Sequence, residues 1–220
     1  MGKKYEIFFS AVFIFAAVLI NGCSSQQTYL VNLEYVKEAV IDYHESGKFT
    51  GDTEKAISDA IGKFDKIIPK KNSAVIFDID ETALSNYQFI KDWDFGYVKK
   101  YFDMWIDSAK APAIPGVLKL YDYLSEKNFR IIFITGRYHY QYDATYKNLV
   151  DAGYTKFDTV IVKGEEYHGV SALEFKSDKR KELAERGYII EGCVGDQWSD
   201  LDGPYHGIQV KIPNYQYIVR

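Results

Sequence analysis

Cysteine is scarce in this sequence, which contains only Cys23 and Cys193 among its 220 residues. If Cys23 carries a lipid, Cys193 has no partner and no intramolecular disulfide can form. Cys193 lies in residues 188–195, a pattern typical of a strand. We therefore interpret it as a small buried apolar residue rather than a nucleophile.

Basic patches, metal-binding histidine patterns and repeats are also lacking. The formal net charge is -4, the pI is about 5.6 and no basic stripe stands out, so we expect no nucleic-acid partner. The histidines share no metal-ligand spacing and are interpreted as surface or loop residues; they are His44, His139, His168 and His206. With 47% hydrophobic residues and no internal repeat, the chain predicts one principal domain with a substantial core.

The N-terminal residues have the pattern of a secretory leader. Lys3 and Lys4 precede an apolar run at residues 7–20, which is too short for a comfortable membrane span. Residues 19–23, Leu-Ile-Asn-Gly-Cys, resemble a bacterial lipobox. That resemblance implies that Cys23 is acylated and becomes the first residue of the mature protein.

This pattern predicts a signal peptide over residues 1–22 and a lipidated tether over residues 23–30. The expected protein is an extracytoplasmic bacterial lipoprotein, held at a membrane by its lipid. Ser24 is not the aspartate that often retains lipoproteins at the inner membrane, which favours the outer membrane if the host is Gram-negative. The alternatives are an ordinary secretory signal, or a short membrane anchor with an incidental cysteine.

Apolar runs alternate with helical patterns through residues 31–220. The clearest run, residues 74–77, continues into Asp78 and Asp80 and is typical of a strand buried on both faces. Further strand patterns lie at 130–135, 159–162, 189–195 and 207–212. Helical spacing covers 31–44, a second helix capped at Asp52 or Thr53 that continues to 68, and 92–115, 115–124, 142–152 and 176–187.

The alternation of strands and helices predicts an α/β fold with a parallel sheet. The insertion that follows the first strand interrupts this alternation and carries helical spacing of its own. We expect it, at about 88–115, to form a small helical cap together with the N-terminal helices at about 31–70.

Polar residues stand where the predicted strands end. Asp78 and Asp80 follow the first strand, Thr135-Gly136-Arg137 ends the second, and Asp196 and Asp200 follow the fourth; Lys176 begins a helix before it. Ligands bind at the carboxyl ends of parallel strands in open α/β sheets, so we expect these side chains to form one site. Taken alone, the first stretch could also be a strand followed by a helix that Asp or Thr caps.

These four stretches resemble the motifs of the haloacid dehalogenase (HAD) superfamily of phosphatases. Asp78-x-Asp80-x-Thr82 is similar to the first motif, and Thr135 and Lys176 to the second and third. Residues 195–200, Gly-Asp-Gln-Trp-Ser-Asp, are similar to the fourth. The resemblance covers about residues 70–215. It is closest to acid phosphatases of the class B/C type, which include bacterial lipoprotein phosphatases and plant vegetative storage proteins.

The resemblance implies an acid phosphatase with an aspartyl-phosphate intermediate. Asp78 would attack phosphorus, which divides one difficult displacement into two easier ones. Asp80 would protonate the leaving oxygen and then deprotonate water, for which a raised pKa is expected. Thr135 and Gly136 would bind phosphoryl oxygens, and Lys176 would supply positive charge.

A Mg²⁺ site is implied by the same resemblance. Asp78, Asp196 and the backbone carbonyl of Asp80 would form an oxygen-rich site of the kind that Mg²⁺ prefers. Asp200 would be a further ligand or would orient the ligands.

The sequence allows two interpretations for several residues. Lys163 and Lys179 are alternatives to Lys176, and Arg137 either binds phosphate or pairs with a surface acid. Trp198 and Tyr87 either form an aromatic wall beside the leaving group or belong to the core. The insertion after the first strand is expected to wall the site with its aromatic residues, Tyr101, Phe102 and Trp105.

Two other functions remain open. A phosphotransferase would use the same intermediate with an alcohol in place of water. A non-catalytic binding or storage protein is disfavoured because Asp78 and Asp80 are both present. The substrate is expected to be a phosphomonoester, with nucleotides, sugar phosphates and aryl phosphates as candidates.

Overall fold

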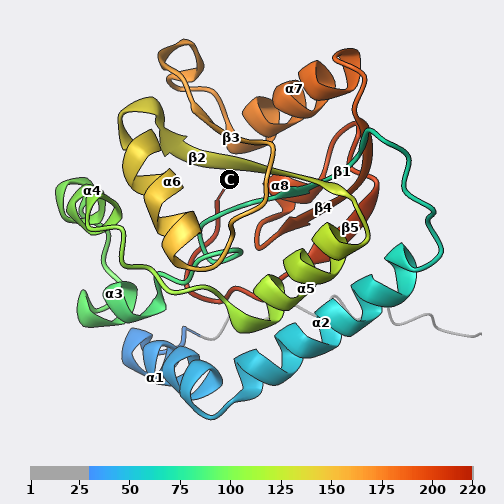
Figure 1. The fold of residues 1–220 in the computed structure, drawn as a ribbon. Helices are drawn as coiled ribbons and strands as arrows, with labels where there is room; N and C mark the ends of the chain where they lie inside the picture. Colours follow the sequence, from blue (N-terminus) through green and yellow to red (C-terminus); the bar gives the residue numbers. More distant parts are fainter. Residues whose placement is uncertain (1–29, 220) are drawn as a thin grey trace, which may run out of the picture. The chain divides into compact units, whose positions relative to one another are not determined.

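Five parallel strands form the centre of the computed structural model, in the order β3-β2-β1-β4-β5 (Figure 1). Their bounds are β1 Ser73–Phe77, β2 Arg130–Tyr138, β3 Thr159–Lys163, β4 Ile189–Gly195 and β5 Ile208–Lys211. All five predicted strands are present. β2 runs three residues beyond the expected end at Thr135, so that Arg137 belongs to the strand itself.

The first strand lies at the middle of the sheet, which explains its unbroken apolar sequence. All of β1 is buried. Val75 and Phe77 belong to the core on one face of the sheet, whereas Ala74 and Ile76 belong to the core on the other. Side chains of a strand alternate between faces, so a strand covered on both sides must be apolar at every position.

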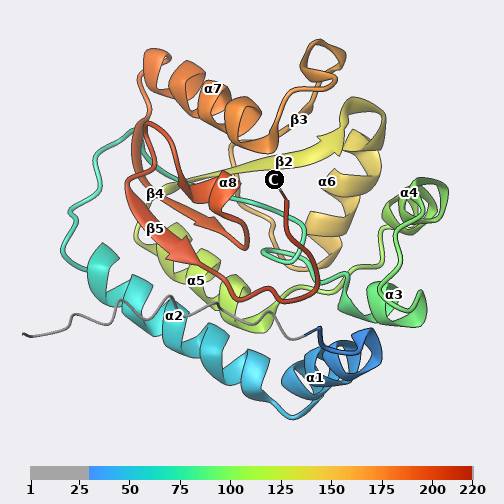
Figure 2. The same ribbon diagram turned by 180° about the vertical axis from the view of Figure 1, so that it is seen from behind.

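Helices cover both faces of this sheet (Figures 1 and 2). On one face lie α2 (Lys48–Phe64), α5 (Pro115–Glu126) and α6 (Tyr142–Asp151), which contribute Phe64, Leu120 and Leu149 to the larger core. On the other lie α7 (Ala172–Glu185) and the short α8 (Trp198–Leu201), which contribute Phe175, Leu183 and Leu201. The predicted α/β fold is confirmed.

A small helical cap follows β1, as expected. It consists of α3 (Tyr87–Asp92) and α4 (Lys99–Asp107). The N-terminal helix α1 (Leu33–Glu45) contacts this cap, with Lys37 Nζ 2.5 Å from Asp94 Oδ2 and with a hydrogen bond from Lys91 to Glu45. The second N-terminal helix, which the sequence analysis assigned to the cap, is instead a layer of the core, because α2 packs on α5 and β5.

Two helices begin earlier than the sequence analysis expected. Asp52 and Thr53 do not cap α2, since it begins at Lys48 after Gly47, whose φ of 87° is a conformation suited to glycine. Similarly, α7 begins at Ala172, where the Ser171 hydroxyl accepts a hydrogen bond from the Glu174 N–H at 3.2 Å. Lys176 therefore lies in the second turn of α7, and its side chain is buried.

The structure describes residues 30–219, and one compact unit begins at Leu33. The expected signal peptide, Cys23 and nearly all of the tether lie outside the described residues. None of the helices within 30–219 combines the length and the apolar character that crossing a bilayer requires.

Candidate active site

The turn after β1 brings Asp78 and Asp80 to the carboxyl edge of the sheet. The Asp78 N–H still bonds to Val194 O of β4 at 2.9 Å, so this residue is held as part of the strand. The chain then turns through Glu81, whose φ of 55° is unusual for a residue with a side chain. Such a conformation persists only where its surroundings fix it, and backbone turns of this kind cluster at functional sites.

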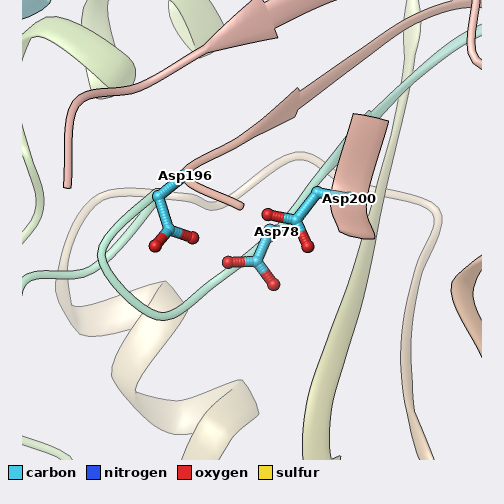
Figure 3. A group of neighbouring side chains, drawn as sticks. All are labelled: Asp78, Asp196 and Asp200. Carbon is cyan, nitrogen blue, oxygen red and sulfur yellow. The ribbon is translucent and has the colours of Figure 1, made fainter. Parts of the chain in front are cut away.

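Three buried carboxylates meet at this edge (Figure 3). They come from Asp78 after β1, Asp196 after β4 and Asp200 in α8, and one oxygen of each lies within 4.8 Å of the others. Within residues 30–219 this is the one such group of potential metal ligands. Gly195 permits the approach of Asp200, because a Cβ at position 195 would lie 2.3 Å from the Asp200 Cβ.

The ammonium group of Lys176 lies between two of these carboxylates. Its Nζ is 2.5 Å from Asp78 Oδ1 and 2.5 Å from Asp200 Oδ1. The two alternative lysines lie elsewhere, since Lys163 Nζ bonds to Val170 O at 2.6 Å and Lys179 Nζ bonds to Glu182 at 3.0 Å. Of the three lysines considered, Lys176 is thus the one that reaches the aspartates.

One lysine does not balance the charge of this cluster. Burial raises the pKa of the Asp78 carboxyl well above its usual value; Lys176 opposes the rise, and the charge of Asp200 adds to it. Burial and then Asp200 likewise raise the pKa of Asp196 to about 7. A divalent cation among these oxygens would favour the ionised carboxylates, so the donor set fits a metal that prefers oxygen ligands.

Asp80 belongs to a different set of contacts. Arg137 Nη2 donates to its Oδ1 at 2.7 Å, and Asn86 Nδ2 donates to the same oxygen at 2.8 Å. Burial acts to raise the pKa of Asp80, but the charge and hydrogen bonds of Arg137 outweigh it and the pKa is lowered. The expectation of a raised pKa is therefore wrong for this structure, because sequence could not show that a cation would pair with this carboxylate.

The sequence also allowed Arg137 to pair with an acid at the surface. This interpretation is wrong, because Arg137 is only 4% exposed and its partner is Asp80 of the candidate site. Of its two neighbours in the second motif, Gly136 lines the cavity of the aspartates and Thr135 is not among the lining residues. Thr135 is fully buried, and its Oγ1 accepts a hydrogen bond from the Arg137 N–H at 3.1 Å. Gly136 lines the cavity that also contains Asp78 and Asp80.

That cavity has a volume of about 490 Å³ and is mostly apolar above a charged floor. Asp78, Asp80 and Lys176 lie at the floor. The cap supplies Phe89, Ile90, Phe95, Tyr97 and Phe102, and the chain after β5 supplies Tyr217, Ile218 and Val219. The cap and the chain after β5, which are far apart in the sequence, thus both contribute apolar side chains to the wall of this cavity.

The predicted aromatic wall is only partly correct. Of the expected cap residues, Phe102 lines the cavity, whereas Tyr101 stacks on Trp93 and Trp105 donates to Asn86 Oδ1 at 2.7 Å. Tyr87 and Trp198, the other two residues considered for an aromatic wall, are not among the residues that line the cavity. Tyr87 stacks on His44, and Trp198 is 58% exposed.

Sequence reasoning missed several residues around the turn that carries Asp80 and Glu81. Asn86 is fully buried, and it bonds both to Asp80 and to Glu81, its N–H lying 2.6 Å from Glu81 Oε1. Tyr217 also donates to Glu81, at 2.7 Å. Burial and the charge of Asp80 raise the pKa of Glu81 to about 7, despite these hydrogen bonds. Only the position of Glu81 beside Asp80 could have drawn attention to it from sequence.

The sequence profile of the HAD superfamily, subfamily IIIB (acid phosphatase), matches residues 21–220. The chain is 34% identical over 170 residues to Acid phosphatase 1 of Solanum lycopersicum, covering 74% of this chain and 67% of that protein. It is 33% identical over 187 residues to the Stem 31 kDa glycoprotein of Glycine max, covering 83% and 74%. Vegetative storage protein 1 of Arabidopsis thaliana is 30% identical over 190 residues, covering 83% and 70%.

The fold is similar to that of a solved crystal structure, the class C acid phosphatase from Bacillus anthracis with tungstate bound. The TM-score is 0.70 at 24% identity, and the match covers 84% of this chain and 86% of that one. At this identity the likeness concerns the fold: a parallel sheet with its surrounding helices in the same arrangement.

Proposed function

Because this chain belongs to subfamily IIIB of the HAD superfamily, the acid phosphatases, we propose that it hydrolyses phosphate monoesters. The reaction proceeds through an aspartyl-phosphate on Asp78 and uses Mg²⁺ as cofactor. One observation carries the proposal: the buried carboxylates of Asp78, Asp196 and Asp200 meet in one cavity, where Lys176 bonds to Asp78 and Asp200. Such an arrangement places a nucleophile, a cation and a binding volume together.

Asp78 is the group placed to attack phosphorus. Its carboxylate oxygen forms the new P–O bond while the bond to the leaving oxygen breaks, and Asp80 gives its proton to that oxygen. In the second step Asp80 takes a proton from water, the water oxygen bonds to phosphorus, and the bond to Asp78 breaks to release phosphate. Lys176 balances the negative charge that gathers on the phosphoryl group.

Asp80 must carry a proton to act first as an acid. Arg137 and Asn86 hold its carboxylate in place and keep its pKa low, so acidic conditions are needed to populate the protonated form.

The residues that would hold Mg²⁺ are Asp78, Asp196 and the backbone carbonyl of Asp80. Asp200 either binds the ion or orients Lys176, to which it is hydrogen-bonded. A bound Mg²⁺ would neutralise charge on the phosphoryl group and on the carboxylates.

The leaving group of the preferred substrate is proposed to be apolar or aromatic. Phe89, Phe102 and Ile218 are among the residues that line the cavity above the aspartates. These side chains favour aryl phosphates over sugar phosphates, because burying sugar hydroxyls against them would leave hydrogen bonds unmade.

The direct test measures release of p-nitrophenol from its phosphate ester, with and without chelation and added Mg²⁺. Wild type should lose activity on chelation and recover with Mg²⁺. Asp78→Asn should remove at least about a thousandfold of the activity, because an amide cannot attack phosphorus. Asp178→Asn is the matched control, since Asp178 is exposed on α7 and should be dispensable.

Acid quenching followed by mass spectrometry should find phosphate on the peptide that contains Asp78. Full activity after exhaustive chelation, or near-normal activity of Asp78→Asn, would count against the proposal. Adding glycerol and looking for a glycerol phosphate separates transfer from hydrolysis.

A storage role is the second candidate, because two of the similar plant proteins are named as a stem glycoprotein and a storage protein. It requires no catalysis. Accumulation without turnover on a panel of phosphate esters would favour it over the enzyme.

For location we propose that the mature protein begins at an acylated Cys23 and acts outside the cytoplasm on a bacterial membrane, the outer one in a Gram-negative host. The support is the lipobox-like stretch at residues 19–23. Several acyl chains anchor stably, whereas one binds only marginally. Mass spectrometry of the purified N-terminus tests this: an unmodified terminus at any residue other than Cys23 would reject lipidation.

A further inference from the structure

The chain after β5 returns to the active site instead of leaving the domain. We call residues 213–219 the strap. In Figure 2 the strap, in red, leaves the end of β5 and turns back toward α8. Within it, Asn214 Nδ2 lies 2.6 Å from Asp196 Oδ2, so a residue outside the four motifs touches a carboxylate of the candidate metal-binding group.

The orientation of the Asn214 amide is fixed by a second hydrogen bond. Its Oδ1 accepts from the backbone N–H of Gln216 at 2.7 Å, which requires an oxygen on that side. The NH₂ group must therefore face Asp196. The backbone at Gln216 thus orients the Asn214 amide so that its NH₂ group donates to Asp196 Oδ2.

Asp196 receives its hydrogen bonds unevenly. Its Oδ2 accepts from Asn214 at 2.6 Å and from Gln197 Nε2 at 2.6 Å, whereas Oδ1 accepts only a longer bond of 3.3 Å from Thr82 Oγ1. The two short bonds occupy Oδ2. They leave Oδ1 as the oxygen available to a cation and prevent the carboxylate from rotating.

The strap is itself held on both sides of the site. The Val219 N–H donates to Gln197 Oε1 at 3.1 Å, beside the fourth motif. Tyr217 donates to Glu81 Oε2 at 2.7 Å, beside the first motif. Two hydrogen bonds, from Tyr217 and from the Val219 N–H, therefore fix the segment that carries Asn214.

We propose that Asn214 is a positioning residue for the metal ion, which acts by orienting the carboxylate of Asp196. The inference rests on the proposed Mg²⁺ dependence. Partners that orient a metal ligand in this way change metal affinity or activity by about 10- to 100-fold when they are removed. Through Asn214, the strap therefore contributes to the metal site.

The test is calorimetric titration of Mg²⁺ and of Mn²⁺ into the chelator-treated full chain. Asn214→Ala and Asn214→Ser should each weaken binding by at least about tenfold. The serine hydroxyl can still accept from the Gln216 N–H, but it is too short to reach Asp196. Tyr215→Phe is the control on the same strap: it keeps the ring contact with Tyr43, at a centroid distance of 4.8 Å, and should bind metal like wild type.

Saturating Mg²⁺ should restore most of the kcat of Asn214→Ser, because the loss lies in metal affinity rather than in chemistry. Metal affinities of both variants within twofold of wild type would overturn the role of Asn214. A kcat of Asn214→Ser that saturating Mg²⁺ fails to restore would also overturn it. If wild type itself binds no metal, the proposed cofactor is wrong, and that result is distinct because it appears before any variant is compared.

Discussion

Arg137 binds both carboxylate oxygens of Asp80, with Nη2 2.7 Å from Oδ1 and Nε 3.0 Å from Oδ2. A forked contact of this kind fixes the plane of the carboxylate as well as its position. The proposed nucleophile and the proposed acid therefore have different partners, since Asp78 bonds to Lys176 and Asp80 to Arg137.

Arg137→Lys should lower kcat by about 10- to 100-fold on p-nitrophenyl phosphate, because a lysine keeps the charge but cannot hold both oxygens, and small misplacement of a catalytic group is costly. Steady-state kinetics measures the effect. Arg130→Lys is the matched control in the same strand, where Arg130 makes an exposed pair with Asp158 at 2.6 Å. Equal kinetics for both variants would remove Arg137 from its positioning role.

Asp80→Asn should affect poor leaving groups most. p-Nitrophenolate leaves readily without a proton, whereas an alkoxide does not, and a general acid contributes about 10²- to 10⁴-fold. Values of kcat/KM across a series of aryl and alkyl phosphates should show a steeper dependence on leaving-group pKa in the variant. A uniform loss across the series would be inconsistent with proton donation by Asp80.

Phe102→Ala should change substrate ranking, because this ring lines the cavity. The loss in kcat/KM for an aryl phosphate relative to a small alkyl phosphate should be about tenfold, the scale of a lost apolar contact. Tyr101→Ala is the neighbouring control, since Tyr101 stacks on Trp93 with centroids 4.3 Å apart and does not line the cavity. An unchanged ranking in Phe102→Ala would make this ring a packing residue.

His44→Phe should stabilise the protein in acid. His44 stacks between Phe49 and Tyr87 with centroid distances of 4.5 and 4.1 Å, and its Nε2 is buried without a hydrogen-bond partner. Burial lowers its pKa to about 4, although the charge of Glu45 opposes this. The unfolded chain takes up this proton first, near pH 6.5, so stability is present at neutral pH and falls as the pH drops from about 6.5 to 4.

Urea unfolding at pH 7 and at pH 4.5 measures this effect. Relative to wild type, His44→Phe should gain about 1–2 kcal/mol more at pH 4.5 than at pH 7, a value reduced from the full pKa difference because the ring is only partly buried. An identical difference in free energy of unfolding at the two pH values would show that His44 does not titrate in this way.

The sequence alone determined the strands and indicated most of the residues that meet at the candidate site. β1 could be recognised because a central parallel strand must be apolar throughout, so that Asp78 and Asp80 mark its end. Asp196 follows β4 for the same topological reason, and its convergence with Asp78 was predictable because parallel strands end at one edge. Helix starts were less certain, since Gly47 and Ser171 compete with other plausible caps.

Only the tertiary structure decided which side chains hold the catalytic groups. Asp80 and Arg137 are 57 residues apart, and Glu81 and Tyr217 are 136 apart, so neither pair leaves a local pattern. A hydrogen bond depends on a few tenths of an ångström and on the direction of donor and acceptor, which hydrophobic periodicity does not specify. Asn214 is the clearest case: its sequence position does not indicate a contact with Asp196, which exists because the strap folds back toward the carboxyl edge of the sheet.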